Sequence, residues 1–330
     1  MGKPTRRLAP WANVDLPDVL ERAAQDYVDW ANKHLTAIEK RTVIRTPLYH
    51  YTDASGLKSI IENDEIWFTD YRYLNDPSEL RHGIFLAHET IKAVQANAGH
   101  AKYLCQMMTD LFCHENFSDH LQFLIACFSR DRDELGQWRA YADNGRGFAI
   151  GLSKKMFAND DPVNKANPLM NVTVGPVRYR DSDTKRRHAL AINEAISGFQ
   201  KATRYARKHL RQKDVFLGFS DRLAREALAS PLVWNCLTCK HPAYARENEV
   251  RLIILGSQKT FNGKVPVRIR KGEIIPYFNR PMGLHKPGNI VEVVIGPAAP
   301  IGAEDGVRTL LDKYKIKARI SRSQIPYKPV

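Results

Sequence analysis

Three charged side chains stand close together directly before an apolar run. The segment reads Glu-Asn-Glu-Val-Arg from Glu247 to Arg251 and leads into Leu252–Ile254. In a strand, Glu247, Glu249 and Arg251 would share one face. Charges on the face of a core strand are costly unless they are solvated, paired or functional. A fixed carboxylate can stabilise positive charge that develops in a transition state; the alternative is a surface ion pair with Arg251, which would contribute little.

A histidine is the second candidate. His50 lies in the β-prone run Leu48–Thr52, so its neighbours Tyr49 and Tyr51 should face the opposite side of the strand. A polar ring in this position could bind a ligand. The alternative is a half-buried histidine that is hydrogen-bonded to a backbone carbonyl.

Three further polar or aromatic side chains follow the apolar run Phe123–Phe128. Ser129 ends this run, where its hydroxyl could belong to a site or cap the next turn. Trp138 and Tyr141 are three residues apart in a predicted short helix, Leu135–Ala142, and so share a face. Aromatic residues at this spacing usually belong to a core, although one of them could stack on a planar ligand.

The elements around His50 can be predicted from local signals. Asp53 or Ser55 can cap a helix whose apolar side follows at helical spacing. Ile66–Thr69 is a predicted second strand, and Asp76-Pro77 would begin another helix. The apolar side of the first helix consists of Leu57, Ile60 and Ile61.

The order of these motifs resembles a bacterial family of uncharacterised proteins that is grouped with the ADP-ribosyltransferases. The resemblance extends over about residues 47–327 and rests on several short motifs. These are His-Tyr-Thr at 50–52, Leu-Asn-Asp-Pro at 74–77, Cys-Phe-Ser at 127–129, Trp-x-x-Tyr at 138–141 and Glu-x-Glu-x-Arg at 247–251.

The resemblance implies that NAD is the substrate and assigns roles to these residues. His50 would hold the adenosine-side ribose, while Tyr51 and Thr52 would help to clamp the nicotinamide amide. Glu249 would grip the 2′-hydroxyl of the nicotinamide ribose, and Glu247 would orient the acceptor. We therefore expect His50 and Glu249 to meet in one cleft, with NAD between the His50 strand and the strand that begins at Phe148.

Supporting roles follow in the same way. Ser129 would support the catalytic glutamate, and Tyr141 would stack on the nicotinamide or the adenine. Arg146, in the turn Gly145–Gly147, could meet the pyrophosphate. The chain departs from the family pattern because it combines a histidine on the first strand with a strand-end serine, which belong to two different subclasses.

Composition excludes several classes of protein. The 330 residues are 43% apolar and 26% charged, which is ordinary for a soluble globular protein. No run of 18 apolar residues and no signal peptide are present, so we expect a cytoplasmic protein without a membrane partner. The five scattered cysteines suit reduced thiols. Cys236-x-x-Cys239 lacks a second pair at zinc-finger spacing, so we predict no metal, and no phosphate-binding glycine motif occurs.

Positive charge concentrates in one predicted helical region, residues 184–230. Residues 178–225 hold thirteen Lys/Arg against five Asp/Glu, a surplus of +8 out of +14 for the whole chain. Such an excess favours a polyanionic partner. The segment could present a nucleic-acid acceptor or an acidic protein, or it could be a solvated helix face. Arg204, Arg207, Lys208 and Arg211 would lie along one side of a helix.

The mixture of elements predicts an α+β fold, because strands and helices do not alternate regularly. Residues 1–46 form a predicted N-terminal helical extension, with an amphipathic helix at 16–40. Residues 47–330 would form the transferase-like domain with a basic helical insertion at about 178–235. The resemblance implies a split, mixed β-sheet with flanking helices for this domain.

The function that we expect is that of an NAD-dependent ADP-ribosyltransferase that modifies nucleic acid, in a toxin or phage-defence role. One alternative is a non-catalytic RNA- or DNA-binding module on a degenerate transferase fold. Another is an NAD-dependent RNA 2′-phosphotransferase, although the further arginines of that family's first motif are not found here.

Overall fold

The computed structural model describes residues 14–74, 79–112, 121–157, 172–257, 266–270 and 272–328. The described residues fall into two units. The helical unit consists of the described residues within 1–38, 78–119 and 178–241. The sheet unit consists of those within 39–77, 120–177 and 242–330. Asp76 and Pro77, where a helix was predicted to begin, lie outside the described residues.

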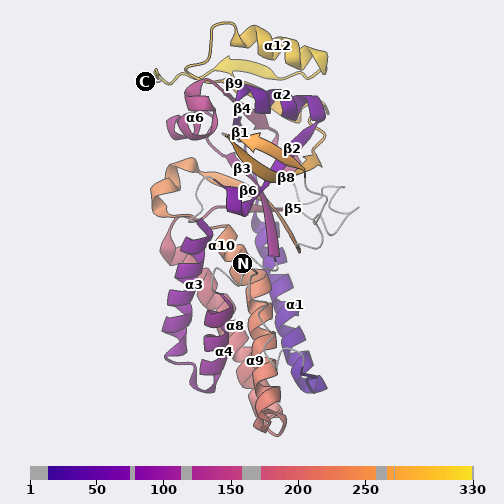
Figure 1. The fold of residues 1–330 in the computed structure, drawn as a ribbon, viewed down its shortest axis with the longest axis vertical. Helices are drawn as coiled ribbons and strands as arrows, with labels where there is room; N and C mark the ends of the chain where they lie inside the picture. The colour runs from indigo at the N-terminus through magenta and orange to yellow at the C-terminus, as the bar shows by residue number, and fades with distance from the viewer. Residues whose placement is uncertain are drawn as a thin grey trace. The chain divides into compact units, whose positions relative to one another are not determined.

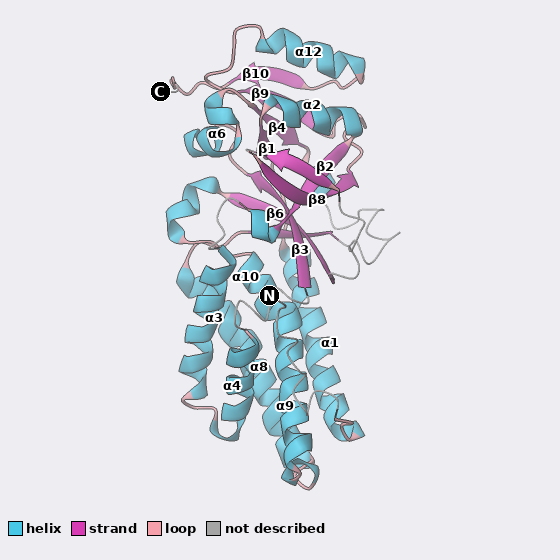
Figure 2. Ribbon diagram, in the orientation of Figure 1, coloured by secondary structure: helices cyan, strands magenta, loops and turns pink. Residues whose placement is uncertain are grey.

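The helical unit consists of helices that run side by side (Figure 2). Helix α3 packs against α8, α4 packs against α9, and α8 packs against α9. Tyr27 of α1 donates a hydrogen bond to the carbonyl of Ala191 in α8. The helices are α1 (Asp18–Arg41), α3 (Glu79–Gln95), α4 (Lys102–Leu111), α8 (Asp181–Tyr205), α9 (Lys213–Ala227) and α10 (Val233–Leu237).

Two helix predictions have different outcomes. The amphipathic helix predicted at 16–40 is confirmed as α1, whose buried side is Leu20, Ala24, Tyr27 and Ala31. The helical region predicted at 184–230 is confirmed, but it is divided, because α8 ends at Tyr205 and α9 begins at Lys213. Like charges four residues apart, as in Arg204–Lys208 and Arg207–Arg211, oppose helix continuation here.

The sheet unit is built on one mixed sheet, as expected for an α+β fold (Figure 1). Its strands pair in the order β10-β9-β4-β1-β3-β2-β8-β7, with β6 beside β3 and β5 beside β6. Among the strands that the structure describes, only the β9–β10 pair is parallel. The strands are β1 (Leu48–Thr52), β2 (Glu65–Asp70), β3 (Leu121–Ser129), β4 (Phe148–Leu152), β5 (Val172–Pro176), β6 (Glu249–Ser257), β7 (Val267–Arg270), β8 (Glu273–Pro281), β9 (Ile290–Ile295) and β10 (Arg319–Arg322).

Strand β3 is the point at which the sheet divides. Along one edge it pairs with β6 over its whole length. Along the other edge it pairs with β1 at Ser129 and with β2 at Leu124 and Ile125. Strands β1 and β2 therefore diverge from a shared edge. Helix α2 (Ala54–Asn63) connects them, and Asp53 caps it by accepting from the Gly56 N–H at 2.7 Å.

The two faces of the sheet bury different side chains. One face, called here the core face, carries apolar residues, mostly aliphatic, that pack against α2 and α12 (Ala303–Lys313). The opposite face, called here the aromatic face, is covered by α6 (Leu135–Tyr141) through Trp138. The core face includes Leu48, Phe128, Ile150, Val250 and Val293, and the aromatic face includes Tyr49, Tyr51, Ala149 and Val294.

Candidate functional site

Five residues with polar side chains and one glycine form a row across six strands of the aromatic face. Residues that stand directly opposite one another in a sheet point to the same side. The pairing register therefore places the row on the face that bears Tyr49. From β10 to β6 the row reads Arg319, Glu292, Gly151, Tyr49, Ser129 and Glu249.

Glu249 begins β6 and is already paired with a cation. Its carboxylate oxygens lie 2.8 Å from Nε and 3.0 Å from Nη2 of Arg251. The exposed fractions of Glu249 and Arg251 are 6% and 1%. The alternative considered for these residues, a surface ion pair, is therefore wrong, because the pair is buried. Its bidentate geometry fixes both side chains.

Glu247 does not lie in the strand, so the prediction that it shares a strand face with Glu249 and Arg251 is wrong. It ends a 3-10 helix, Pro242–Glu247, and is followed by Asn248 in the left-handed region at φ 44°. Asparagine tolerates this conformation better than most residues. The turn at Asn248 therefore separates Glu247 from the alternation of β6.

Three of the predicted site residues contact one another beside this turn. The Tyr141 hydroxyl donates to Oε1 of Glu247 at 3.1 Å. The Ser129 hydroxyl donates to the backbone carbonyl of Glu247 at 2.8 Å and accepts from the Asp131 N–H at 3.0 Å. Ser129 thus caps the turn after β3 and also holds the Glu247 backbone. We call Ser129, Tyr141 and Glu247 the strand-end cluster.

His50 faces the other side of the sheet. It stands opposite Ile150, on the core face, and its ring lies 5.5 Å from that of Phe128. Its Nδ1 lies 2.9 Å from the carbonyl oxygen of Cys127. Burial, together with the charge of Arg268, lowers the pKa of His50, so the neutral ring donates its Nδ1–H to this carbonyl. The expectation that His50 and Glu249 meet in one cleft is therefore wrong.

The remaining predicted NAD-binding residues are dispersed. Tyr51 lies on the aromatic face, where its hydroxyl donates to the Asp131 carbonyl at 2.8 Å and accepts from the Glu134 N–H at 3.2 Å. Burial raises the pKa of Tyr51 above its usual range. Thr52 ends β1 on the same side as His50, and Arg146 is exposed after a 3-10 turn.

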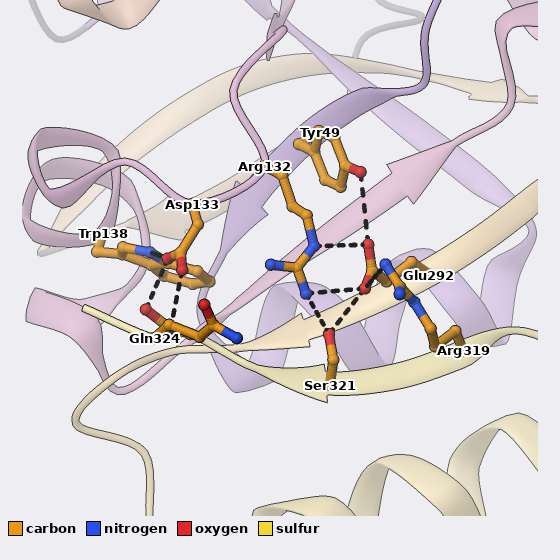
Figure 3. A network of polar contacts seen from close by, with 9 residues as sticks. Tyr49, Arg132, Asp133, Trp138, Glu292, Arg319, Ser321 and Gln324 are labelled. Atoms are coloured by element: carbon orange, nitrogen blue, oxygen red, sulfur yellow. Dashed lines mark hydrogen bonds and ion pairs between the residues drawn. The ribbon is translucent and has the colours of Figure 1, made fainter. Parts of the chain in front are cut away.

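A charged network on the aromatic face was not anticipated (Figure 3). Glu292 of β9 is 3% exposed and binds Arg132 through two hydrogen bonds of 2.9 and 3.0 Å. Ser321 donates to the same carboxylate at 2.7 Å, and Arg319 lies 2.6 Å from it. Burial would raise the pKa of Glu292, but the bonds from Arg132 and Ser321 outweigh it and hold this pKa below its usual range.

Asp133, the residue after Arg132, forms a separate group of contacts with α6 and with the C-terminal segment. Its carboxylate accepts from Trp138 Nε1 at 2.7 Å, from the Ser323 hydroxyl at 2.6 Å and from the Gln324 N–H at 2.9 Å (Figure 3). Ile325 packs against the aromatic face beside these residues. The aromatic face is therefore covered in the region of Trp138, whereas the strand-end cluster contains the half-buried Glu247.

The basic residues lie in the helical unit. Arg204 is in the last turn of α8, and Arg207, Lys208 and Arg211 lie in the connection to α9, which contains a 3-10 turn at His209–Arg211. All four are exposed. They do not form the single helix face that was predicted, because α8 ends before three of them.

The described residues show neither a cluster of metal ligands nor a membrane-spanning helix. No group of three or more His, Cys, Asp or Glu residues in this part of the chain could hold a metal ion. Cys236 and Cys239 are buried and form no disulfide, and Cys113 lies outside the described residues. None of the described helices is long and apolar enough to cross a membrane.

Comparison with known proteins gives one partial match. Residues 137–252 match the model of a family described as a protein of unknown function (DUF2971). This segment contains Tyr141, Glu247 and the basic connection, but it contains neither His50 nor Ser129. No curated protein and no solved structure matches the chain.

Proposed function

We propose that the chain is an ADP-ribosyltransferase that consumes NAD, with its reactive centre at the strand-end cluster. The observation that carries this proposal is the convergence of Ser129, Tyr141 and Glu247 from three different elements. They meet on the sheet face that bears Glu249, which is buried against Arg251. A half-buried carboxylate beside a phenol is a suitable group for binding a sugar hydroxyl or stabilising a cation.

The chemistry follows from the reacting bond. When the bond between nicotinamide and ribose breaks, positive charge develops on the sugar ring, and nicotinamide leaves with the bonding electrons. The Glu247 carboxylate would stabilise this charge in the transition state more than in bound NAD. The Tyr141 hydroxyl, which donates to Glu247, would orient the carboxylate. An acceptor nucleophile then attacks the ring carbon, forms the new bond and releases its proton to water.

Glu249 and Arg251 would act as positioning residues in this scheme. Arg251 compensates the charge of Glu249, and both side chains are buried. The burial of this carboxylate argues against a direct contact with a ribose hydroxyl. The pair instead fixes the first residues of β6, which directly follow the turn at Asn248. The proposal therefore moves the catalytic role from Glu249 to Glu247 and gives His50 no contact with NAD.

The test is release of nicotinamide from NAD by the purified chain, followed by chromatography, with and without a cell lysate as the source of acceptors. Glu247→Gln keeps the shape and removes the charge, so we expect about a hundredfold slower release. Glu304→Gln is the matched control, because Glu304 is an exposed carboxylate on α12 that is paired with Arg308. Equal rates for the wild type and Glu247→Gln would contradict the assignment, and no release by the wild type would contradict the activity.

One observation favours a second candidate, a nucleic-acid-binding module without catalysis. The buried pairing of Glu249 with Arg251 removes the carboxylate that the resemblance assigns to the reaction. A chain that binds nucleic acid but releases no nicotinamide in any lysate would belong to this class. Labelled NAD distinguishes the candidates further: label that nuclease removes from the product identifies a nucleic-acid acceptor, and label that protease removes identifies a protein.

A further inference from the structure

The surplus positive charge of the helical unit is concentrated where α8 turns into α9. Residues 201–214 contain six Lys/Arg and one acidic residue, Asp214. We call the six basic residues the cationic tip. All of them are exposed, and none forms an ion pair with another residue in the described part of the chain. They are Lys201, Arg204, Arg207, Lys208, Arg211 and Lys213.

The other basic residues of the same region are mostly committed to contacts within the protein. Arg180 and Arg186 both bind Asp183, and Lys185 binds Glu89. Arg222 and Arg225 bind acidic residues one turn away on α9, while Arg187 is half-buried and its Nη2 donates to Thr238. The uncompensated charge of residues 178–225 therefore belongs chiefly to the tip.

An exposed aromatic ring stands among these cations. Tyr205 is the last residue of α8, next to Arg204 and two residues before Arg207, and its exposed fraction is 84%. A tyrosine at a helix end usually turns its ring onto the core, because the ring carries a large apolar area. A ring that remains in solvent, with an arginine beside it and another two residues later in the sequence, is instead available for stacking.

We propose that the cationic tip binds single-stranded nucleic acid, with phosphates on the basic residues and an unpaired base on Tyr205. Cations that follow the phosphate backbone, together with aromatic rings that stack on bases, are the features of non-specific single-strand binding. A duplex keeps its bases stacked on one another, so it would use the cations alone. An acidic protein would likewise engage the charges and gain little from the tyrosine ring. This inference is independent of NAD cleavage.

The test measures fluorescence anisotropy of a labelled 20-nucleotide oligo-uridine with the full chain at rising salt. If about five phosphates are contacted, affinity should fall roughly a hundredfold between 50 and 200 mM salt. The triple variant Arg204→Gln/Arg207→Gln/Arg211→Gln should bind at least about tenfold more weakly and show a clearly shallower salt dependence. The control Arg180→Gln/Lys185→Gln/Arg186→Gln removes the same charge from the other end of α8 and should bind like the wild type.

Tyr205 separates the single-strand proposal from general charge attraction. Tyr205→Ala should weaken oligo-uridine binding about tenfold without changing its salt dependence, and Tyr205→Phe should restore it. Binding of an RNA duplex of equal length should not respond to Tyr205→Ala.

Three results would overturn the proposal. In the first, the tip variant and the control bind oligo-uridine equally. In the second, Tyr205→Ala leaves oligo-uridine binding unchanged. In the third, polyglutamate displaces the oligonucleotide as well as unlabelled oligo-uridine does, which would assign the tip to an acidic protein.

Discussion

Tyr49 reaches Glu292 from two strands away by passing over Gly151. The hydroxyl lies 3.4 Å from Oε2 of the carboxylate, although β4 runs between β1 and β9. Gly151 stands opposite both residues in the register. A Cβ atom at Gly151 would lie 2.9 Å from Cε1 of Tyr49 and 3.4 Å from Cβ of Glu292. The missing side chain of Gly151 is thus what allows the tyrosine ring to lie across the sheet.

Gly151→Ala should destabilise the chain by about 1–3 kcal/mol, because the methyl group overpacks the Tyr49 ring. Gly198→Ala is the control. Gly198 lies within α8, and a Cβ atom there meets nothing within 4 Å, so the substitution should stabilise by about 0.5–1 kcal/mol. Urea denaturation measures both free energies of unfolding. Equal effects of the two substitutions would show that Gly151 does not clear space for the ring.

His50 offers a direct comparison between the resemblance and the structure. The resemblance places this ring on NAD, whereas the structure places it on the core face against the Cys127 carbonyl. His50→Gln keeps a hydrogen-bond donor for that carbonyl. If the wild type releases nicotinamide from NAD, we expect the folded variant to release it at about the wild-type rate, with an unchanged KM. A rate of nicotinamide release that is lower by a hundredfold or more, as expected for Glu247→Gln, would show that His50 belongs to the NAD site.

The buried pair of Glu249 and Arg251 should be costly to break. Arg251→Met leaves a buried carboxylate without this cation and should destabilise by about 3–5 kcal/mol, while Glu249→Gln/Arg251→Met should cost less than the sum of the single changes. The control is Arg308→Met, because Arg308 pairs with Glu304 at an exposed helix surface, where such a pair contributes at most about 1 kcal/mol. Similar losses for both arginines would contradict the role of burial.

His188 should make the helical unit sensitive to acid. Burial, followed by the charge of Arg187, lowers the pKa of His188 to about 3, against about 6.5 in an unfolded chain. The unfolded state therefore binds a proton first as the pH falls. The contribution of His188 to the free energy of unfolding is fully present above about pH 6.5. Below that pH it decreases by up to about 1.4 kcal/mol for each pH unit.

Urea denaturation between pH 7 and pH 4 measures this effect. The comparison is between the wild type and His188→Leu, whose stability should vary less over this range. His209→Leu, at an exposed histidine, should behave as the wild type. A wild-type profile parallel to that of His188→Leu would show that His188 does not titrate with unfolding.

Local signals predicted much of the sheet but not all of it. Strand β1 has the predicted bounds and β4 begins at Phe148 as predicted, because both are short β-prone or apolar runs. Strand β8 was largely missed. It contains Pro276 within its length and begins with the exposed residues Glu273 and Ile274. A proline within a run argues against a strand, and here β8 is recognisable only from its pairing with β2 and β7.

The candidate site shows the limit of strand periodicity. Alternation correctly predicted that His50 and Tyr49 face opposite sides, but it could not relate the faces of two distant strands. The pairing of Tyr49 with Ser129 and of Ser129 with Glu249 places these three residues on one face of the sheet. A register shift of one residue would have placed them on opposite faces. Glu292 could have been recognised as a candidate from the sequence, because it is the one charged residue in the run Ile290–Ile295. Its partner Arg132 is 160 positions away and could not be found from spacing.

Segments of the two units alternate along the chain, and this order affects both the synthesis of the protein and its proteolysis. The helical unit takes residues from three separate stretches, and the last of them ends at position 241. During synthesis on the ribosome, Tyr27 of α1 therefore cannot contact Ala191 of α8 until that residue, 164 positions later, has been added to the chain. Strand β6, which covers one edge of β3, is synthesised later still. Early helices and strands thus emerge before their partners, which favours assistance by chaperones. No single cleavage of the backbone can release either unit intact.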